Sequence, residues 1–233
     1  MTSSQIAVAP AAAATPLSAV CLPERSILVS LRISEWRGRR RDKKVTHDVA
    51  LQHGADTKTA GIYTKALVPK KFLSKLDAIT SQARTLHYEL TLPWLDDGQR
   101  ILPIDLHLDY MEKIRELRSK FETAVAEFLG AYDEAKAAAR TSLGDLYRES
   151  DYPSLARLET AFAFAVKLQP LPVACDWRVD LPEATVAEIR RDLEAEVEAA
   201  QRVGLADLYR RLAKVVSRMA TTLAQPDKVF RLC

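Results

Sequence analysis

Hydrophobic residues recur at helical spacing over two long proline-free stretches, residues 104–152 and 183–225. Apart from one gap between Ala200 and Leu208, the apolar positions follow steps of three and four residues, which is typical of a coiled-coil seam. They are Tyr110, Ile114, Leu117, Phe121, Ala124, Phe128, Ala131, Ala135 and Ala138 in the first stretch, and Val186, Ile189, Leu193, Val197, Ala200, Leu208, Leu212, Val215 and Met219 in the second. The pattern predicts two long helices, residues 105–141 and 183–223, packed together as an antiparallel hairpin.

Charge along the second predicted helix is polarised. Residues 183–200 hold six acidic side chains against two arginines, and residues 201–219 hold five basic side chains against one aspartate. Acidic residues near the N-terminus of a helix and basic residues near its C-terminus complement the helix dipole. The flanking prolines, Pro182 and Pro226, agree with these helix limits.

Alternating hydrophobic and polar residues elsewhere predict short strands. The clearest lies near residues 26–34, where Ile27, Val29, Leu31 and Ile33 alternate with polar side chains. Further strands are predicted at residues 86–92, 100–102, 162–168 and 173–179, with a hairpin turn at Asp97-Gly98. One shorter helix between the first two strands is marked by Phe72, Leu76, Ile79 and Ala83.

These elements predict an α+β fold that is predominantly α: a long antiparallel helical hairpin with a small β-sheet and one short helix. We expect a single domain over residues 23–225, in which residues 23–104 form a basic strand, helix and hairpin part and residues 105–225 contain the helical hairpin with short strands between. Residues 226–233 are expected to be a C-terminal tail.

The first 22 residues are rich in Ala and Pro. They hold no Lys or Arg and no continuous apolar run, so they resemble a disordered arm rather than a secretory signal. No window of the chain approaches the roughly 18 consecutive apolar residues that a membrane span needs, so we expect no membrane association.

Composition excludes several classes of protein. The 233 residues are 48% hydrophobic and 28% charged, which is typical of a globular protein and not of a disordered or collagen-like chain. The seven glycines form neither a G-x-G-x-x-G turn nor a Walker loop. The three cysteines, Cys21, Cys175 and Cys233, are widely spaced, which indicates no disulfide framework and no zinc site and fits a reducing cytoplasm. We therefore expect no cofactor.

Catalytic motifs are missing as well, so we expect that the protein is not an enzyme. Asp105, His107 and Asp109 alternate, and they would share one face and could hold a metal ion if this segment were extended. If the segment instead opens the long helix, as the seam from Tyr110 favours, Asp105 or Asp109 becomes an N-cap.

Positive charge is concentrated in the N-terminal third of the chain. Residues 23–90 hold fourteen Lys and Arg against seven acids, a net charge of +7, whereas the whole chain carries +3. Clustered cations neutralise phosphates, and aromatic rings among them offer bases a stacking face, a combination that suits single-stranded nucleic acid, with single-stranded DNA favoured. The candidate binding residues are Trp36, Arg37, Arg39, Arg40, Arg41, Lys43, Lys44, Tyr63, Lys65, Lys70, Lys71 and Lys75.

Two other interpretations of this basic segment stay open. It could dock an acidic protein partner, or it could be a solvated face that contributes only solubility. A second apolar stripe beside the first seam, Val125, Leu129 and Tyr132, predicts in addition that the protein is a homo-oligomer, a dimer or a larger ring.

Several short segments occur in an order known from one protein family. They are the segments 31–38 (LRISEWRG), 69–73 (PKKFL), 100–103 (RILP), 128–132 (FLGAY) and 161–164 (AFAF). In this order the chain, over roughly residues 27–222, resembles an uncharacterised family of tailed bacteriophages and prophages, the domain of unknown function 3150 (DUF3150). The long Ala/Pro arm and the Arg39–Arg41 run depart from the family.

The resemblance implies no catalytic residues. It implies a phage or prophage protein in the cytoplasm of a bacterial host cell, and together with the basic segment this predicts a nucleic-acid-binding protein of phage DNA metabolism. The resemblance implies that, in phage genomes, the gene lies beside genes for a MoxR-type AAA+ ATPase and a von Willebrand factor A-like protein. The resemblance therefore also implies an alternative function, a structural scaffold or adaptor that docks such an ATPase.

Overall fold

A four-stranded antiparallel sheet organises the computed structural model, which describes residues 25–56, 58–95, 98–172 and 183–224. The strands are β1 (Ser26–Ser34), β4 (Leu92–Pro93), β5 (Arg100–Pro103) and β6 (Ala163–Pro170), in the order β4-β5-β1-β6. In the central strand β1, Val29 lies opposite Arg100 of β5 and Leu168 of β6. The predicted strands near 26–34, 100–102 and 162–168 are confirmed, whereas Asp97 and the predicted strand 173–179 lie outside the described residues.

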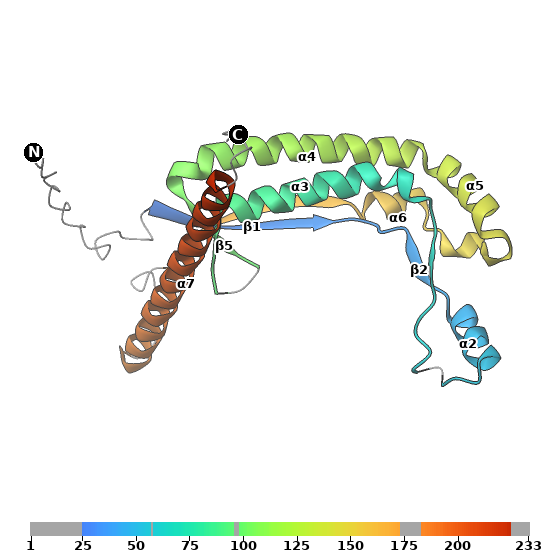
Figure 1. Ribbon diagram of the computed structural model, residues 1–233, viewed down its shortest axis with the longest axis horizontal. Coiled ribbons are helices and arrows are strands. Elements are labelled where there is room, and N and C mark those ends of the chain that lie inside the picture. Colours follow the sequence, from blue (N-terminus) through green and yellow to red (C-terminus); the bar gives the residue numbers. More distant parts are fainter. Residues whose placement is uncertain (1–24, 57, 96–97, 173–182, 225–233) are drawn as a thin grey trace, which may run out of the picture.

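Helices run along the sheet and extend from both of its ends (Figure 1). They are α2 (Lys43–Gln52), α3 (Ser74–Leu90), α4 (His107–Gly130), α5 (Tyr132–Leu143), α6 (Leu155–Glu159) and α7 (Glu183–Leu223), with short 3₁₀ turns at Lys70–Phe72, Ile104–Leu106, Gly144–Leu146 and Glu149–Asp151. A separate two-stranded ribbon pairs β2 (Arg39–Arg41) with β3 (Thr64–Ala66). The predicted fold class, α+β and predominantly α, is confirmed. No helix in the described ranges is long and apolar enough to cross a bilayer.

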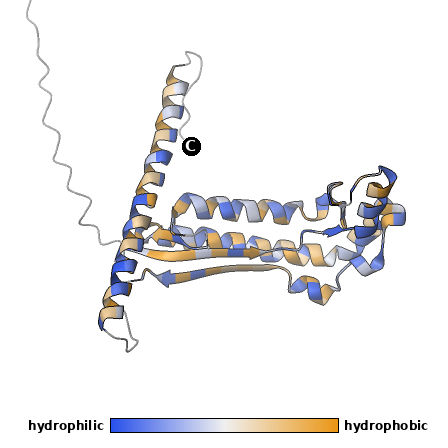
Figure 2. Ribbon diagram, turned by 90° about the horizontal axis from the view of Figure 1, so that it is seen from below, coloured by the Kyte–Doolittle hydropathy of each residue, from blue (hydrophilic) through white to orange (hydrophobic). Residues whose placement is uncertain are grey.

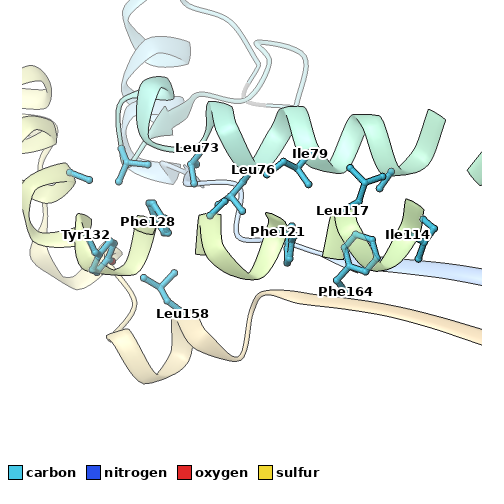
Figure 3. Close-up of a cluster of buried hydrophobic side chains, with 14 of the residues drawn as sticks. Leu73, Leu76, Ile79, Ile114, Leu117, Phe121, Phe128, Tyr132, Leu158 and Phe164 are labelled. Atoms are coloured by element: carbon cyan, nitrogen blue, oxygen red, sulfur yellow. The ribbon is translucent and has the colours of Figure 1, made fainter. Parts of the chain in front are cut away.

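The main core lies between α3, α4 and one face of the sheet. Every seam position predicted from Tyr110 to Phe128 is buried in α4, as the hydrophobic spacing requires. These side chains pack against Leu76 and Ile79 of α3 and against Phe164 of β6 (Figure 3). The ring centroids of Phe121 and Phe164 are 5.6 Å apart, so aromatic contacts join the helix pair to the sheet.

A long antiparallel helical hairpin is present, but its partners differ from those predicted. α4 pairs with α3: His87 Nδ1 lies 2.8 Å from Tyr110 Oη at one end of the pair, and Lys75 forms an ion pair with Glu127 at the other. The β4–β5 hairpin joins the two helices, and a short connection favours antiparallel neighbours. A seam defines which face of a helix is buried but not which helix covers it, so the spacing could not distinguish α3 from α7.

The helix α7, whose predicted limits 183–223 are confirmed, packs on the sheet away from the main core. Ala200 contributes to a second cluster with Leu28, Trp94, Ile101 and Leu171. Alternation along β1 explains the two layers, because Leu28 faces this cluster while Val29 faces the main core.

One arginine ties α7 to the end of α3. The guanidinium group of Arg211 donates to the backbone carbonyls of Tyr88, Glu89 and Thr91 at distances of 2.7–3.0 Å. These carbonyls lie at the C-terminal end of α3, where the helix has no partners of its own for them. Beyond this contact the C-terminal part of α7 projects clear of the rest of the molecule (Figure 2).

Two other predictions along this region are wrong. Residues 86–90 belong to α3 and not to a strand, because Leu86 and Leu90 are also spaced as neighbours on one helical face. The first long helix does not run unbroken from 105 to 141, because it is preceded by a 3₁₀ turn and is interrupted at Ala131.

The segment around His107 opens the long helix, as the seam from Tyr110 favoured, but the predicted cap is wrong. It is helical, so Asp105, His107 and Asp109 do not share the face of a strand, and the described residues contain no cluster that could hold a metal ion. Neither aspartate is the N-cap, since α4 begins after Leu106 without a side-chain cap. Asp105 instead pairs with Arg25 at 3.1 Å.

The apolar stripe that predicted self-association is largely covered. Tyr132 is only 2% exposed, and Val125 and Leu129 pack against the main core. These residues therefore extend the seam where α4 meets α5, and they leave only a partly exposed surface for the homo-oligomer that was predicted.

Truncation of the central aromatic residue tests the core. We expect Phe121→Ala to lower the free energy of unfolding by about 3–5 kcal/mol, since the side chain is buried between α3 and the sheet. Urea denaturation followed by circular dichroism measures this loss. The exposed neighbour Ser119→Ala is the control and should change stability by less than about 0.5 kcal/mol. A loss below about 1 kcal/mol for Phe121→Ala would contradict the packing described.

Candidate nucleic-acid interface

Residues 39–66 form a small basic module, consisting of β2, α2 and β3, at the end of the molecule opposite α7 (Figure 1). The chain enters it through Gly38, whose φ of +59° favours glycine. A Cβ atom at this position would lie 2.9 Å from both Leu73 and Val68. The turn therefore depends on glycine for its backbone conformation and for its close packing.

The helix α2, which the hydrophobic pattern did not predict, begins at a side-chain cap. The Asp42 carboxylate accepts hydrogen bonds from the backbone N–H groups of Lys44 and Val45, at 3.1 and 3.2 Å. The N–H group of Val45 and then the Lys65 ammonium hold the pKa of Asp42 below its ordinary value. This cap places Lys43 and Lys44 in the first turn of an exposed helix.

Lys65 is the centre of a buried ionic network, not a ligand for nucleic acid. Its side chain is 1% exposed, and Nζ donates to Asp42 at 3.1 Å, to Asp151 at 2.6 Å and to the carbonyl of Leu146 at 2.7 Å. All three hydrogens of the ammonium group thus have acceptors. The prediction that Lys65 contacts phosphate is wrong, because β3 turns this side chain inward.

Arg40 belongs to the same network. Its Nε lies 3.1 Å from Asp151 Oδ1, while the other oxygen of Asp151 faces Lys65. Two cations and two carboxylates therefore neutralise one another, and they fix the ribbon against the segment 146–151. Arg40 is half exposed, but it is already paired with Asp151. It could therefore contact nucleic acid only in addition to this ion pair.

Trp36 is also placed differently from the prediction. Its ring packs against Phe128 and Tyr132, with centroid distances of 5.9 and 6.0 Å, and it is partly buried. A ring with these neighbours is a wall of the core and not a free platform for a base. Tyr63 is the candidate aromatic residue that does reach the surface, at 38% exposure.

The remaining candidate residues are exposed cations. Those whose side chains have no hydrogen-bond or ionic partner among the described residues are Arg37, Arg39, Arg41, Lys43, Lys44 and Lys70. Lys71 lies 4.8 Å above the ring of Phe72, and Lys75 is paired with Glu127. Most of the predicted positive charge therefore faces solvent and is available to an anionic partner.

In the described part of the chain, three cavities that border β2 carry this charge. The first, which we name the arginine cavity, has a volume of about 570 Å³ and is lined by Arg39, Arg40, Arg41 and Arg157, with Trp36 and Tyr152 among its other walls. The second, of about 640 Å³, is lined by Arg37, Arg39, Lys70 and Arg84, together with the acids Glu35 and Asp77. The third, of about 460 Å³, contains Arg41, Lys43, His47, Lys58 and Ile62. Arg39 and Arg41 each border two cavities, so β2 is the centre of one basic surface.

Some residues of this surface were missed by the sequence analysis. Arg157 lies in α6, far along the chain from the basic segment, and only the fold brings it to β2. Lys58 and Arg84 contribute to the net charge of residues 23–90, but nothing in their spacing singled them out.

No protein-family model matches this chain, and no match was found among curated proteins or among solved structures. The charge and shape of the surface around β2 are therefore the basis for a functional assignment.

Removal of the buried ammonium tests how the basic module is held. We expect Lys65→Met to lower the free energy of unfolding by about 3–5 kcal/mol, because Asp42 and Asp151 lose a common partner while they remain buried. Lys71→Met, at an exposed position, is the control.

The pH dependence of unfolding supplies a second readout. The pKa of Asp42 is lowered in the folded state, so its contribution is present above about pH 4 and is lost as the pH falls through the folded-state value. That acid-dependent loss should be smaller in Lys65→Met. Equal stability of Lys65→Met and the native protein at pH 7 would show that the network does not hold the module.

Proposed function

We propose that the protein is a non-enzymatic nucleic-acid-binding protein that holds single-stranded DNA across the basic surface around β2. The observation that carries this proposal is the position of Arg39 and Arg41. Each borders two cavities, and neither guanidinium group has an acidic partner in the described parts of the chain. Free guanidinium groups pair readily with phosphate oxygens.

The arrangement suits a flexible polyanion. The five free cations between residues 37 and 44 follow a β-ribbon and the first turn of α2, so they can contact successive phosphates of one strand. Tyr63 and Ile62, exposed by 38% and 59% beside this path, offer apolar surface to unpaired bases. Duplex DNA has no unstacked bases to use that surface, which is why we favour a single strand.

The resemblance to the phage family DUF3150 is consistent with this proposal and stays a prediction. If it holds, the DNA bound is that of a phage or prophage, and the protein acts in the cytoplasm of the bacterial host cell. We expect no metal or nucleotide cofactor to be needed for binding.

Salt dependence measures the number of phosphate contacts. With five cations engaged, the slope of log K against log salt concentration should be about −3.5 for a single strand. The affinity should then fall about 100-fold between about 50 and 200 mM salt. Fluorescence polarisation with a labelled oligothymidylate gives this slope directly, and the absence of salt-sensitive binding would defeat the proposal.

Two double variants with the same change in net charge test whether β2 is the binding surface. Arg39→Glu with Arg41→Glu should abolish binding, and Arg40 is left unchanged because it holds Asp151. Lys113→Glu with Arg115→Glu, at exposed positions of α4, makes the same change in net charge and should leave binding within about twofold. Equal losses in both pairs would indicate an effect of net charge alone.

A second candidate function is a scaffold or adaptor that docks a MoxR-type AAA+ ATPase or a von Willebrand factor A-like partner. The observation that favours it is an apolar stripe on the C-terminal half of α7, where Leu208, Leu212, Val215 and Met219 are 40–59% exposed. Exposed apolar stripes of this kind are typical of protein interfaces. Homo-oligomerisation stays a prediction too, and this stripe is a surface available for it.

One double variant tests the stripe. We expect Leu208→Gln with Leu212→Gln to abolish both self-association in light scattering and co-purification with an AAA+ protein, while DNA binding is kept. Ala206→Gln, exposed on the same helix, is the control and should change neither property. An ATPase that co-purifies with the native protein and with Arg39→Glu/Arg41→Glu, while no salt-sensitive DNA binding is seen, would favour the scaffold function over DNA binding.

A further inference from the structure

The arginine cavity contains more positive charge than its surroundings balance. Arg39, Arg40 and Arg41 reach it from β2, and Arg157 reaches it from α6. Among the described residues, Asp151 is the one acidic residue that lines it. The cavity volume, about 570 Å³, is in the range of small-ligand sites.

The single carboxylate is fully engaged. Asp151 Oδ1 faces Arg40 Nε at 3.1 Å, and Oδ2 faces Lys65 Nζ at 2.6 Å. Lys65 in turn pairs with Asp42, so two cations and two carboxylates cancel. Arg39, Arg41 and Arg157 are left over, and among the described residues none of them has an ionic partner.

Three unbalanced guanidinium groups around one cavity repel one another, and an anion that enters removes this repulsion. Arginine pairs with phosphate through two parallel hydrogen bonds, which a lysine cannot do. An internal phosphodiester carries one negative charge, whereas a phosphomonoester carries about −1.5 to −2 at pH 7. An excess of three positive charges therefore favours the monoester.

One polar group in the wall of the cavity adds to the arginines. Of the apolar lining residues, Leu67 and Leu158 are 2% and 0% exposed and Trp36 is partly buried, so they offer a ligand little surface. Tyr152 also lines the cavity, and its hydroxyl group is buried without a hydrogen-bond partner in the described structure. Burial raises the pKa of Tyr152 to about 12, so this hydroxyl stays protonated and can donate to an acceptor.

We propose that the arginine cavity binds a phosphomonoester, either the terminal phosphate of a nucleic-acid strand or a free mononucleotide. The first source rests on the proposed function, since the strand would lie on the adjoining basic surface. The second does not require polynucleotide binding. In the first case the protein distinguishes the end of a strand from its interior.

Three versions of one short oligothymidylate test the strand end: 5′-phosphorylated, 3′-phosphorylated and unphosphorylated. We expect one phosphorylated version to bind the native protein at least about 10-fold more tightly than the unphosphorylated one, as two charge-assisted hydrogen bonds allow. In Arg157→Gln this ratio should fall to about one. Arg115→Gln, at another exposed arginine, which lies in α4 and lines none of the three cavities, should keep the ratio.

The protonation of the phosphate provides an independent check. The second pKa of a phosphomonoester is about 6, so the ratio should decrease as the pH falls from about 7 to about 5. Thermal melting of Arg157→Gln confirms that the fold is retained, and Arg41→Gln is a second variant of the same cavity.

Direct titration with dTMP tests the mononucleotide source. Binding of dTMP that is lost in Arg157→Gln supports the cavity. If added dTMP removes only the 10-fold preference for the phosphorylated oligonucleotide, both ligands bind in the cavity. If the unphosphorylated strand does not bind but dTMP does, the proposed function fails and the cavity stands. If the three oligonucleotides bind equally and dTMP does not bind, or if Arg157→Gln keeps the ratio, the inference is overturned.

Discussion

The buried ion pairs of Lys65 join the basic module to the remainder of the molecule. Through Asp42 they reach the cap of α2, and through Asp151 they reach the segment that leads to α6. A buried lysine is costly to leave unpaired, so each carboxylate is held to the position where it meets the ammonium group. The module, the arginine cavity and the spacing of the exposed arginines all depend on this contact.

The same network explains why neighbouring arginines differ in role. Arg40 is used to complete the charge balance of Asp151, while Arg39 and Arg41, one residue away on either side, are not. Arg40 lies opposite Lys65 in the ribbon and shares Asp151 with it, so a run of three arginines on β2 supplies structural and ligand-binding charge together. A negatively charged ligand meets the two arginines that the protein leaves free.

Much of the fold could be predicted from the hydrophobic pattern. The seam from Tyr110 to Phe128, the strand β1 and the limits of α7 follow from local spacing, because burial of one face imposes that spacing directly. The pairing of α4 with α3 could not be predicted in this way. It depends on the β4–β5 connection, while the Arg211 contact places α7 at the end of α3.

The candidate site was only partly predictable for a related reason. The basic segment could be recognised from composition, and most of its cations are exposed. The inward turn of Lys65, the packing of Trp36 on Phe128 and the arrival of Arg157 depend on contacts between distant segments. The helix α2 buries only Thr46 and Ala50, so it has no hydrophobic pattern that predicts it. The capping aspartate Asp42 was the signal that could have revealed it.

Photo-cross-linking tests most directly whether nucleic acid lies on the surface around β2. An oligonucleotide that contains 4-thiothymidine would be irradiated with the native protein, and the cross-linked peptides would be identified by mass spectrometry. Our account predicts cross-links in residues 37–44 and at Tyr63, with fewer at high salt. Cross-links confined to α7, or spread evenly over the chain, would contradict it.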